Sequence, residues 1–152
     1  MTRDVTFVLF GATGHLARTK LIPALARTIE AMGVEKFILV GVGARTRTDD
    51  DLRELVARAL VDAGISATTS ERFLAAPIAY ESVVDGGFDR LTDTVTRLER
   101  MSGLSGNRVL YLAVPPSDLD PTVTGIAQCG LARSEGWIRL VVEKPFGVDL
   151  AT

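Results

Sequence analysis

Residues 5–20 read VTFVLFGATGHLARTK, and the fold of the chain is decided here. A continuous apolar run, typical of a strand covered on both faces, leads into a glycine-rich corner that opens a helical pattern. The first turn of a helix has unpaired N–H groups and favours negative charge, so this order of elements predicts an anion site. In the pattern G-x-x-G-x-x-A, Gly11 lets the chain turn, Gly14 leaves the backbone open to a pyrophosphate, and Ala17 lets the helix pack closely. Glycine-rich corners also end strands for purely structural reasons, so the pattern alone leaves both interpretations open.

The composition indicates one core-rich globular domain. The chain has 152 residues, 47% of them hydrophobic, and a mean hydropathy of +0.24. Its formal net charge of −2 gives no general attraction to nucleic acid or to acidic membranes. Without an apolar run of membrane-spanning length or a signal-peptide core, we expect a cytoplasmic protein that binds neither membrane nor nucleic acid. One cysteine, Cys129, and one histidine, His15, argue against an internal disulfide and against a metal site.

Apolar runs alternate with helical patterns along the chain, which predicts an α/β fold. Strands are expected over residues 5–10, 37–42, 108–114 and 137–142, with a weaker, edge-like strand over 73–80 that contains Pro77. Helices are expected over residues 15–32, 49–63, 88–101 and 117–130. This alternation implies parallel pairing and right-handed crossovers. The predicted fold is a doubly wound, mainly parallel, Rossmann-like sheet with helices on both faces and ligands at the carboxyl ends of its strands. Tyr111 and Trp137, within strands, are expected to lie in the core.

The segment after the second expected strand indicates which dinucleotide would bind. Sites for NAD usually have Asp or Glu here to accept from the ribose hydroxyls, whereas sites for NADP offer Arg to the 2′-phosphate. This chain has no acidic residue at the end of the strand and continues with Arg45, Thr46 and Arg47. Planar guanidinium groups suit a phosphate dianion, so the segment predicts NADP in preference to NAD. The alternative is a solvated arginine pair that balances the acidic residues 49–51.

Lysine is rare in this chain, which makes Lys20 and Lys144 informative. Lys144 follows the last expected strand, in the crevice where its ammonium group can hold a substrate oxygen beside a nicotinamide ring. The neighbouring Glu143 would act as a base or only orient Lys144. Lys20 either reaches over the strand ends toward a substrate or lies along the surface. We expect no catalytic role for His15, because a helix N-terminus disfavours its cationic form, and we expect Cys129 to be a packed side chain.

The last residues, 149–152, resemble the opening of another helix. A strand without its following helix would leave part of a sheet face uncovered. We therefore interpret residues 1–152 as one dinucleotide-binding domain, truncated before the next helix, at the front of a longer protein. A frayed tail is the alternative. The uncovered face would favour self-association.

Four blocks of the sequence together resemble the N-terminal coenzyme domain of glucose-6-phosphate dehydrogenases. The blocks are GATGHLARTKLIPAL at 11–25, VGVGARTRT at 40–48, NRVLYLAVPP at 107–116 and RLVVEKPFGVDL at 139–150. They follow the family's order at about its spacing over nearly the whole chain, and EKPFG together with the first block is a specific combination. The resemblance implies the NADP-binding domain of an oxidoreductase of the pentose phosphate pathway, which transfers hydride from C1 of glucose 6-phosphate to NADP.

The same resemblance implies roles for individual residues. Arg45 would contact the 2′-phosphate, Lys144 would contact both the coenzyme and glucose 6-phosphate, and Lys20 would lie near the sugar. The cofactor-binding residues implied in this way are Gly11, Ala12, Thr13, Gly14, His15, Leu16, Ala17, Arg45 and Lys144.

Three departures from the family's pattern bear on function. His15 stands where the family has Asp, so a carboxylate is missing at the phosphate corner, and Leu119 stands where a tyrosine is expected. The segment R-I-D-H-Y-L-G-K-E, with the family's catalytic histidine, is absent together with the large C-terminal substrate domain. That reaction needs a base for the C1 hydroxyl proton, so we expect this chain to bind coenzyme without turnover and to contain no catalytic residue. The alternatives are a non-catalytic module that senses NADP, and a degenerate remnant that self-associates.

Overall fold

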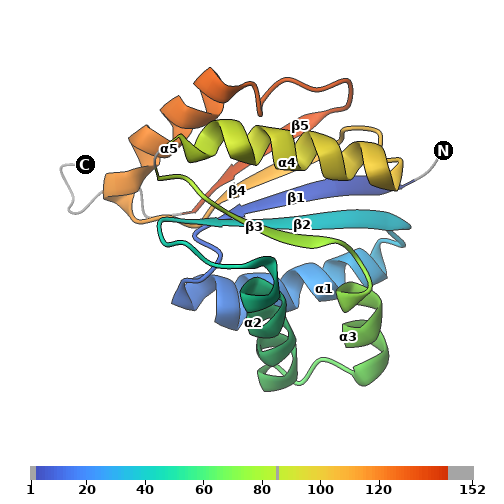
Figure 1. Cartoon of the computed structure of the whole chain (residues 1–152). Coiled ribbons are helices and arrows are strands. Elements are labelled where there is room, and N and C mark those ends of the chain that lie inside the picture. The colour runs from blue at the N-terminus through green and yellow to red at the C-terminus, as the bar shows by residue number, and fades with distance from the viewer. Residues whose placement is uncertain (1–2, 85, 144–152) are drawn as a thin grey trace.

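A parallel sheet of five strands forms the centre of the protein (Figure 1). The computed structural model describes residues 3–84 and 86–143. The strands are β1 (Asp4–Phe10), β2 (Lys36–Gly43), β3 (Ile78–Ser82), β4 (Arg108–Leu112) and β5 (Ile138–Val142). Their order across the sheet is β3-β2-β1-β4-β5, and every neighbouring pair is parallel. The chain therefore proceeds outward from β1 in both directions, which confirms the predicted doubly wound, Rossmann-like fold.

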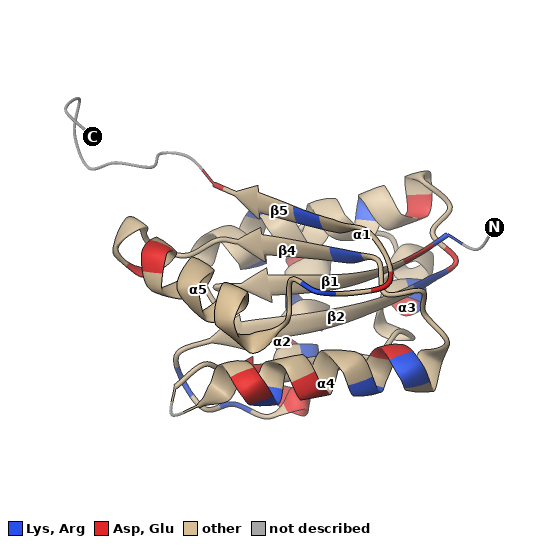
Figure 2. Ribbon diagram, turned by 90° about the horizontal axis from the view of Figure 1, so that it is seen from above, with Lys and Arg blue, Asp and Glu red and all other residues tan. Residues whose placement is uncertain are grey.

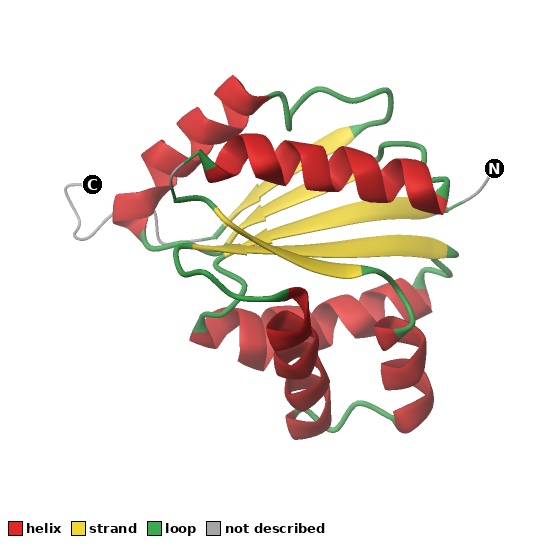
Figure 3. Cartoon of the chain, in the orientation of Figure 1, coloured by secondary structure: helices red, strands yellow, loops and turns green. Residues whose placement is uncertain are grey.

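Helices cover both faces of the sheet (Figure 3). A π-helix, η1 (Ala17–Leu21), runs into α1 (Ile22–Ala31), and α2 (Asp49–Asp62) and α3 (Ala67–Leu74) lie on the same side. The opposite side is covered by α4 (Gly87–Ser102) and α5 (Pro116–Cys129). This division follows from right-handed crossovers, because the chain reverses its direction across the sheet after β3.

The sheet separates two apolar layers. On the side of α1 and α2, Leu9 of β1 belongs to a cluster with Ala17 and Leu52. On the other side, Val8 belongs to a cluster with Leu91 of α4. Each of these side chains is at most 1% exposed. Adjacent residues of β1 enter opposite layers, and because both layers are apolar, the sequence of β1 is continuously apolar instead of alternating.

The first helix changes its winding just before Pro23. The π-helical turn Ala17–Leu21 is followed by α1, in which Pro23 occupies one of the first two positions. Pro23 has no N–H group to donate to the carbonyl of Thr19, as an α-helical pattern would require. The wider turn directly ahead of Pro23 is consistent with this missing donor, and it is the turn that carries Lys20.

Residues 67–74 form α3, whereas the sequence predicts no helix here and a strand that begins at Phe73. The helix starts at Ser66, whose hydroxyl accepts from the N–H of Thr69 at 3.2 Å. Near its end, Phe73 is 2% exposed and packs on Phe37 with ring centroids 4.9 Å apart. The capping serine and a single buried aromatic residue stabilise this short helix. The apolar periodicity of the sequence did not indicate it.

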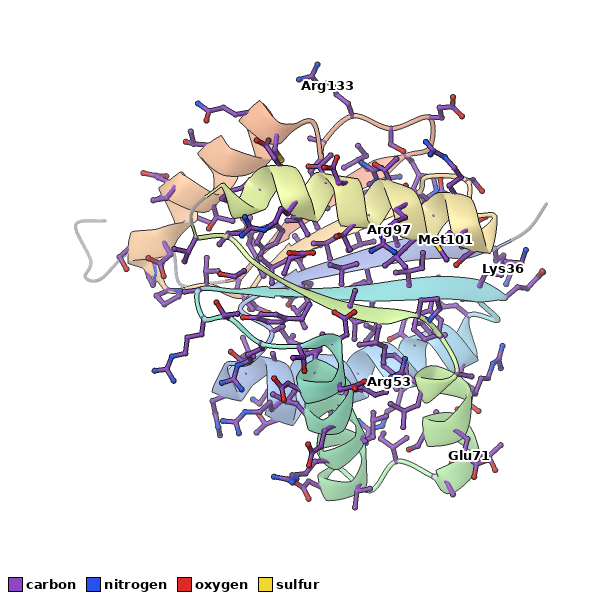
Figure 4. The ribbon with its side chains drawn as sticks, viewed as in Figure 1. Lys36, Arg53, Glu71, Arg97, Met101 and Arg133 are labelled. Carbon is purple, nitrogen blue, oxygen red and sulfur yellow. The ribbon has the colours of Figure 1, made fainter. Side chains whose placement is uncertain are left out.

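The strand expected over residues 73–80 is displaced to Ile78–Ser82. It begins directly after Pro77 and forms an edge of the sheet, which is the position that a proline favours. Arg53 of α2 lies between α2 and the segment that joins α3 to β3 (Figure 4). It donates to the carbonyl of Ala76 at 3.2 Å and so satisfies a backbone acceptor in this turn.

An open apolar groove of about 560 Å³ lies between α1 and the first parts of β1 and β4, and its lining includes Phe7, Val109 and Trp137. Trp137 is 43% exposed, so its predicted place in the core is wrong. The guanidinium group of Arg139 lies over its ring, 5.2 Å from the centroid. On this side the described apolar cluster takes its strand residues from β1 to β4, and β5 is an outer edge of the sheet (Figure 2). Self-association through this face stays a prediction.

Candidate functional site at the carboxyl edge of the sheet

The corner after β1 is held between the ends of two neighbouring strands. Gly11 adopts a φ of 82°, and its N–H donates to the carbonyl of Val42, at the end of β2, at 2.9 Å. On the other side, a Cβ at Gly11 would lie 2.1 Å from the carbonyl oxygen of Ala113, just after β4. A residue with a side chain therefore fits neither the backbone angle nor the space. The predicted need for glycine at position 11 has a direct steric cause.

The seven predicted cofactor residues of the corner differ in how far they are exposed to solvent. Ala12 and Ala17 are at most 1% exposed, so they can offer a ligand only their backbone. Their side chains support the corner from inside, and close packing of the helix at Ala17 is as predicted. Thr13 is half-buried, and Gly11 likewise. The exposed members, which a ligand can reach directly, are Gly14, His15 and Leu16.

Gly41 also supports the corner from inside, and sequence reasoning missed this residue. A Cβ at Gly41 would lie 2.9 Å from Cβ of Ala12 and 2.6 Å from Cδ2 of Leu52. Only glycine at this point of β2 lets the corner and α2 approach the sheet together. The available signal was a glycine inside a buried strand, which often marks a close approach.

The segment after β2 carries Arg45 and Arg47, and both are exposed. It ends at a capping box, in which the N–H of Asp51 donates to the Thr48 hydroxyl and the N–H of Thr48 donates to the Asp51 carboxylate. Hydrogen bonds from Thr48, and then the nearby charge of Arg47, lower the pKa of Asp51 against the opposing effect of burial. The spacing of Thr48 and Asp51 in the sequence is typical of such a capping box.

A polar groove of about 600 Å³ runs between the first helix and α2. His15 and Arg18 line it from the first helix, and Arg47 lines it from the segment after β2. The structure thus brings the corner and the arginine segment together at one edge of the sheet. Arg47, and not Arg45, belongs to the shared wall.

At the ends of β4 and β5, the hydroxyl of Tyr111 donates to the Glu143 carboxylate. The pKa of Tyr111 is raised to about 12, chiefly by burial and further by this hydrogen bond and the carboxylate charge. The sequence left Glu143 as a base or as an orienting group for Lys144, and the structure gives its carboxylate a partner on β4. Lys144 itself lies outside the described residues. The predicted contact region after β5 is therefore described only up to Glu143.

Other predicted residues have plainer surroundings. Lys20 is exposed on η1, close in sequence to the corner. Leu119, the departure from the family's tyrosine, and Cys129 are partly buried and pack against the core under α4 and α5. His15 is exposed at the start of the first helix. Both Leu119 and Cys129 therefore act as packing side chains of α5.

Within residues 3–84 and 86–143, no cluster of three or more His, Cys, Asp or Glu side chains is arranged to hold a metal ion. Over the same residues, no helix has the length and apolar character to cross a membrane. Basic and acidic residues are interspersed along helices such as α4 (Figure 2).

Comparison with known proteins identifies relatives over nearly the whole chain. The family model described as glucose-6-phosphate dehydrogenase, NAD binding domain, matches residues 8–152. The glucose-6-phosphate 1-dehydrogenase of Bacillus subtilis (strain 168) is 35% identical over 147 residues, which are 94% of this chain and 29% of that protein. The Arabidopsis thaliana protein named inactive glucose-6-phosphate 1-dehydrogenase 4, chloroplastic, is 36% identical over 155 residues, covering 96% of this chain and 24% of that protein.

Solved structures give the same result. A glucose-6-phosphate dehydrogenase in complex with its substrate glucose-6-phosphate has a TM-score of 0.78 at 27% identity, covering 99% of this chain and 32% of that one. Glucose-6-phosphate 1-dehydrogenase from Mycobacterium avium has a TM-score of 0.73 at 28% identity, covering 99% and 31%. The chain spans about a third or less of the length of these relatives.

Proposed function

The chain belongs to the glucose-6-phosphate dehydrogenase family, of which it is an NAD-binding domain, and from this premise we propose that it binds NADP at the carboxyl edge of its sheet. In the whole protein, the domain would serve an oxidoreductase that transfers hydride from C1 of glucose 6-phosphate to NADP. The observation that supports this most is the hydrogen bond from Gly11 to Val42, which joins the phosphate corner to the strand that carries the arginine segment.

The corner fits the pyrophosphate of a dinucleotide. Chain neighbours aside, a Cβ at Gly14 would have one described atom within 4 Å, the carbonyl oxygen of Gly11 at 3.2 Å. The backbone is open on its other side, where the start of the first helix offers N–H groups and the positive end of the helix dipole. A bound nicotinamide coenzyme supplies the hydride acceptor, and the residues of this chain hold its phosphates.

Lys20 and Lys144 are the proposed contacts for the sugar phosphate. Lys20 is exposed on the π-helical turn that follows the corner. Lys144 is next in sequence to Glu143, whose carboxylate is held by Tyr111 at the end of β4. Together, the two ammonium groups would neutralise a phosphate and hold a sugar hydroxyl.

We expect NADP to bind about ten-fold more tightly than NAD, measured by isothermal titration calorimetry. A charge-assisted hydrogen bond is worth about 1.5–3 kcal/mol, and 1.4 kcal/mol corresponds to ten-fold in affinity. Arg45→Ala should remove most of the preference. Arg97→Ala is the matched control, because it removes an exposed arginine from α4, on the opposite side of the sheet. Tighter binding of NAD would contradict the NADP assignment, and an unchanged preference in Arg45→Ala would transfer the 2′-phosphate contact to Arg47.

The 152-residue chain is expected to bind NADP without oxidising glucose 6-phosphate. Its one histidine, His15, is exposed at the phosphate corner, at the start of the first helix. The reaction needs a general base at the C1 hydroxyl, and we propose that this base belongs to the substrate domain of the whole protein. The measurement is NADPH absorbance with both ligands in excess. Reproducible turnover by the chain, abolished by Lys144→Ala, would show that the 152 residues are sufficient.

A second candidate is a non-catalytic domain that reports NADP. The observation in its favour is the relative named as an inactive glucose-6-phosphate 1-dehydrogenase, which is 36% identical over 96% of this chain. Titration of the NADP-loaded chain with glucose 6-phosphate separates the two candidates. Binding that Lys20→Ala weakens supports the dehydrogenase domain, whereas NADP binding without any sugar-phosphate binding supports the sensor.

A further inference from the structure

Tyr80, on the edge strand β3, contacts residues 45–49, which form the arginine segment. Its side chain is 5% exposed, and its hydroxyl donates to the carbonyl of Arg45 at 2.6 Å. Its backbone N–H donates to the Asp49 carboxylate at 2.8 Å. One residue of β3 therefore binds both the beginning and the end of residues 45–49.

The position of the Tyr80 hydroxyl depends on a glycine opposite to it. A Cβ at Gly43 would lie 2.4 Å from Oη of Tyr80, and the next nearest atom, Cζ of the same ring, would lie at 3.4 Å. The hydroxyl thus occupies the space that any side chain at position 43 would need. Gly43 does not require an unusual backbone angle here, since it is not among the glycines with positive φ. Because Gly43 has no side chain, the Tyr80 hydroxyl has room to contact Arg45.

Further bonds hold the two ends of the segment. The Ser82 hydroxyl donates to the carbonyl of Ala44 at 3.3 Å, beside the Tyr80 contact. The capping box of Thr48 and Asp51 fixes the other end. Between these points the side chains of Arg45 and Arg47 are exposed, so the hydrogen bonds of the segment act on its backbone and leave the guanidinium groups to solvent or to a ligand.

The Tyr80 hydroxyl remains a donor over the physiological range. Burial raises the pKa of Tyr80, and the positive charge of Arg47 opposes this rise.

From this geometry we infer that Tyr80 is a positioning residue for coenzyme selection, because its hydroxyl fixes the backbone that presents the guanidinium groups to the 2′-phosphate. The inference rests on the proposed function, since it assumes that residues 45–47 meet the 2′-phosphate of NADP. A backbone held in advance loses less conformational freedom when the phosphate binds. The contribution of Tyr80 should therefore appear with ligands that carry a 2′-phosphate and not with those that lack it.

The test compares Tyr80→Phe with the natural chain by calorimetric titration of NADP, NAD, 2′,5′-ADP and 5′-AMP. Phenylalanine keeps the buried ring and removes only the donor. We expect the Kd of NADP and of 2′,5′-ADP to rise about five-fold, as for the loss of one hydrogen bond, and those of NAD and 5′-AMP to rise less than two-fold. Thr94→Val is the matched control, since it removes a buried hydroxyl that donates to Glu81 of β3 at 2.7 Å, away from the arginine segment. It should leave the ratio of the two affinities unchanged.

Gly43→Ala provides a second, independent measurement. In the natural chain its methyl group would displace the Tyr80 hydroxyl, so the preference for NADP should fall as in Tyr80→Phe. In the Tyr80→Phe background the nearest atom to this methyl group is at 3.4 Å, so adding Gly43→Ala should change the preference less than two-fold further. Equal losses for all four ligands, additive effects of the two substitutions, or an unchanged preference in Tyr80→Phe would each overturn the inference. If the natural chain binds no dinucleotide, the proposed function fails and the inference fails with it. If only the inference is wrong, the natural chain still prefers NADP to NAD.

Discussion

Arg108→Met is expected to lower the free energy of unfolding by about 3–5 kcal/mol, because it leaves a buried carboxylate without its counter-charge. Arg108, 4% exposed, donates from Nε and Nη2 to the two carboxylate oxygens of Glu99 at 2.9 and 2.8 Å. Glu99 is 6% exposed and also accepts from the Thr6 hydroxyl at 2.8 Å. Nη1 of Arg108 donates to the carbonyls of Leu131 and Arg133. One guanidinium group thus joins the start of β4, the end of α4 and the turn after α5, with its partner bonded to β1.

The measurement is urea unfolding of the natural chain, of Arg108→Met, and of the double variant Arg108→Met with Glu99→Leu. The double variant should recover part of the loss, since it no longer buries an unpaired charge, although the hydroxyl of Thr6 and two carbonyls lose a partner. Arg58→Met is the matched control. Arg58 forms a pair with Glu54 at 3.5 Å, with both side chains more than 70% exposed, and its loss should cost less than about 0.5 kcal/mol. A cost for Arg108→Met no larger than that of Arg58→Met would show that the buried pair is not needed for stability.

The ion pair between Arg108 and Glu99 could not be predicted from local sequence patterns. Arg108 could be read only as the first residue of an apolar strand, because its partners on α4 and β1 become neighbours only in the folded sheet. One signal was available. Leu91 and Val95 are fully buried on α4, and Glu99 continues their four-residue spacing. An acidic residue on the buried face of a helix requires a partner, and the sequence offers Arg108 nine residues further on.

The strands and the corner were predictable because their signals are local. Continuous apolar runs and the spacing of Gly11, Gly14 and Ala17 define β1 and its turn without knowledge of the rest of the fold. The same reasoning failed between α2 and β3, where a serine cap and one aromatic contact form α3. Because the strand was placed too early, Tyr80 was read as its last residue and its contact with Arg45 could not be anticipated. Residue type alone singled out the arginine segment as a candidate, whereas the contact that holds its backbone in place is tertiary.

Gly11→Ala is expected to lower the free energy of unfolding by about 3 kcal/mol and to raise the Kd of NADP more than ten-fold. The left-handed backbone costs a residue with a Cβ about 1–2 kcal/mol, and overpacking adds about 1–3 kcal/mol. The new methyl group would lie 2.1 Å from the carbonyl oxygen of Ala113, whose N–H donates to Phe10 at 2.9 Å. The corner can relieve this overlap only by moving away from β4, which would break the alignment of its N–H groups with the phosphates of the proposed coenzyme.

Gly64→Ala separates the two causes. Gly64 has a φ of 72°, close to that of Gly11, but no described atom lies within 4 Å of the place where its Cβ would be. It should therefore show only the backbone cost, about 1 kcal/mol, with unchanged coenzyme affinity. Urea unfolding and NADP titration of the two variants measure the difference. Equal costs would mean that the overlap with Ala113 is relieved without a change at the corner. Normal NADP affinity in a destabilised Gly11→Ala chain would mean that the phosphates bind elsewhere, because a corner displaced from the strand ends cannot present the same N–H groups to the coenzyme.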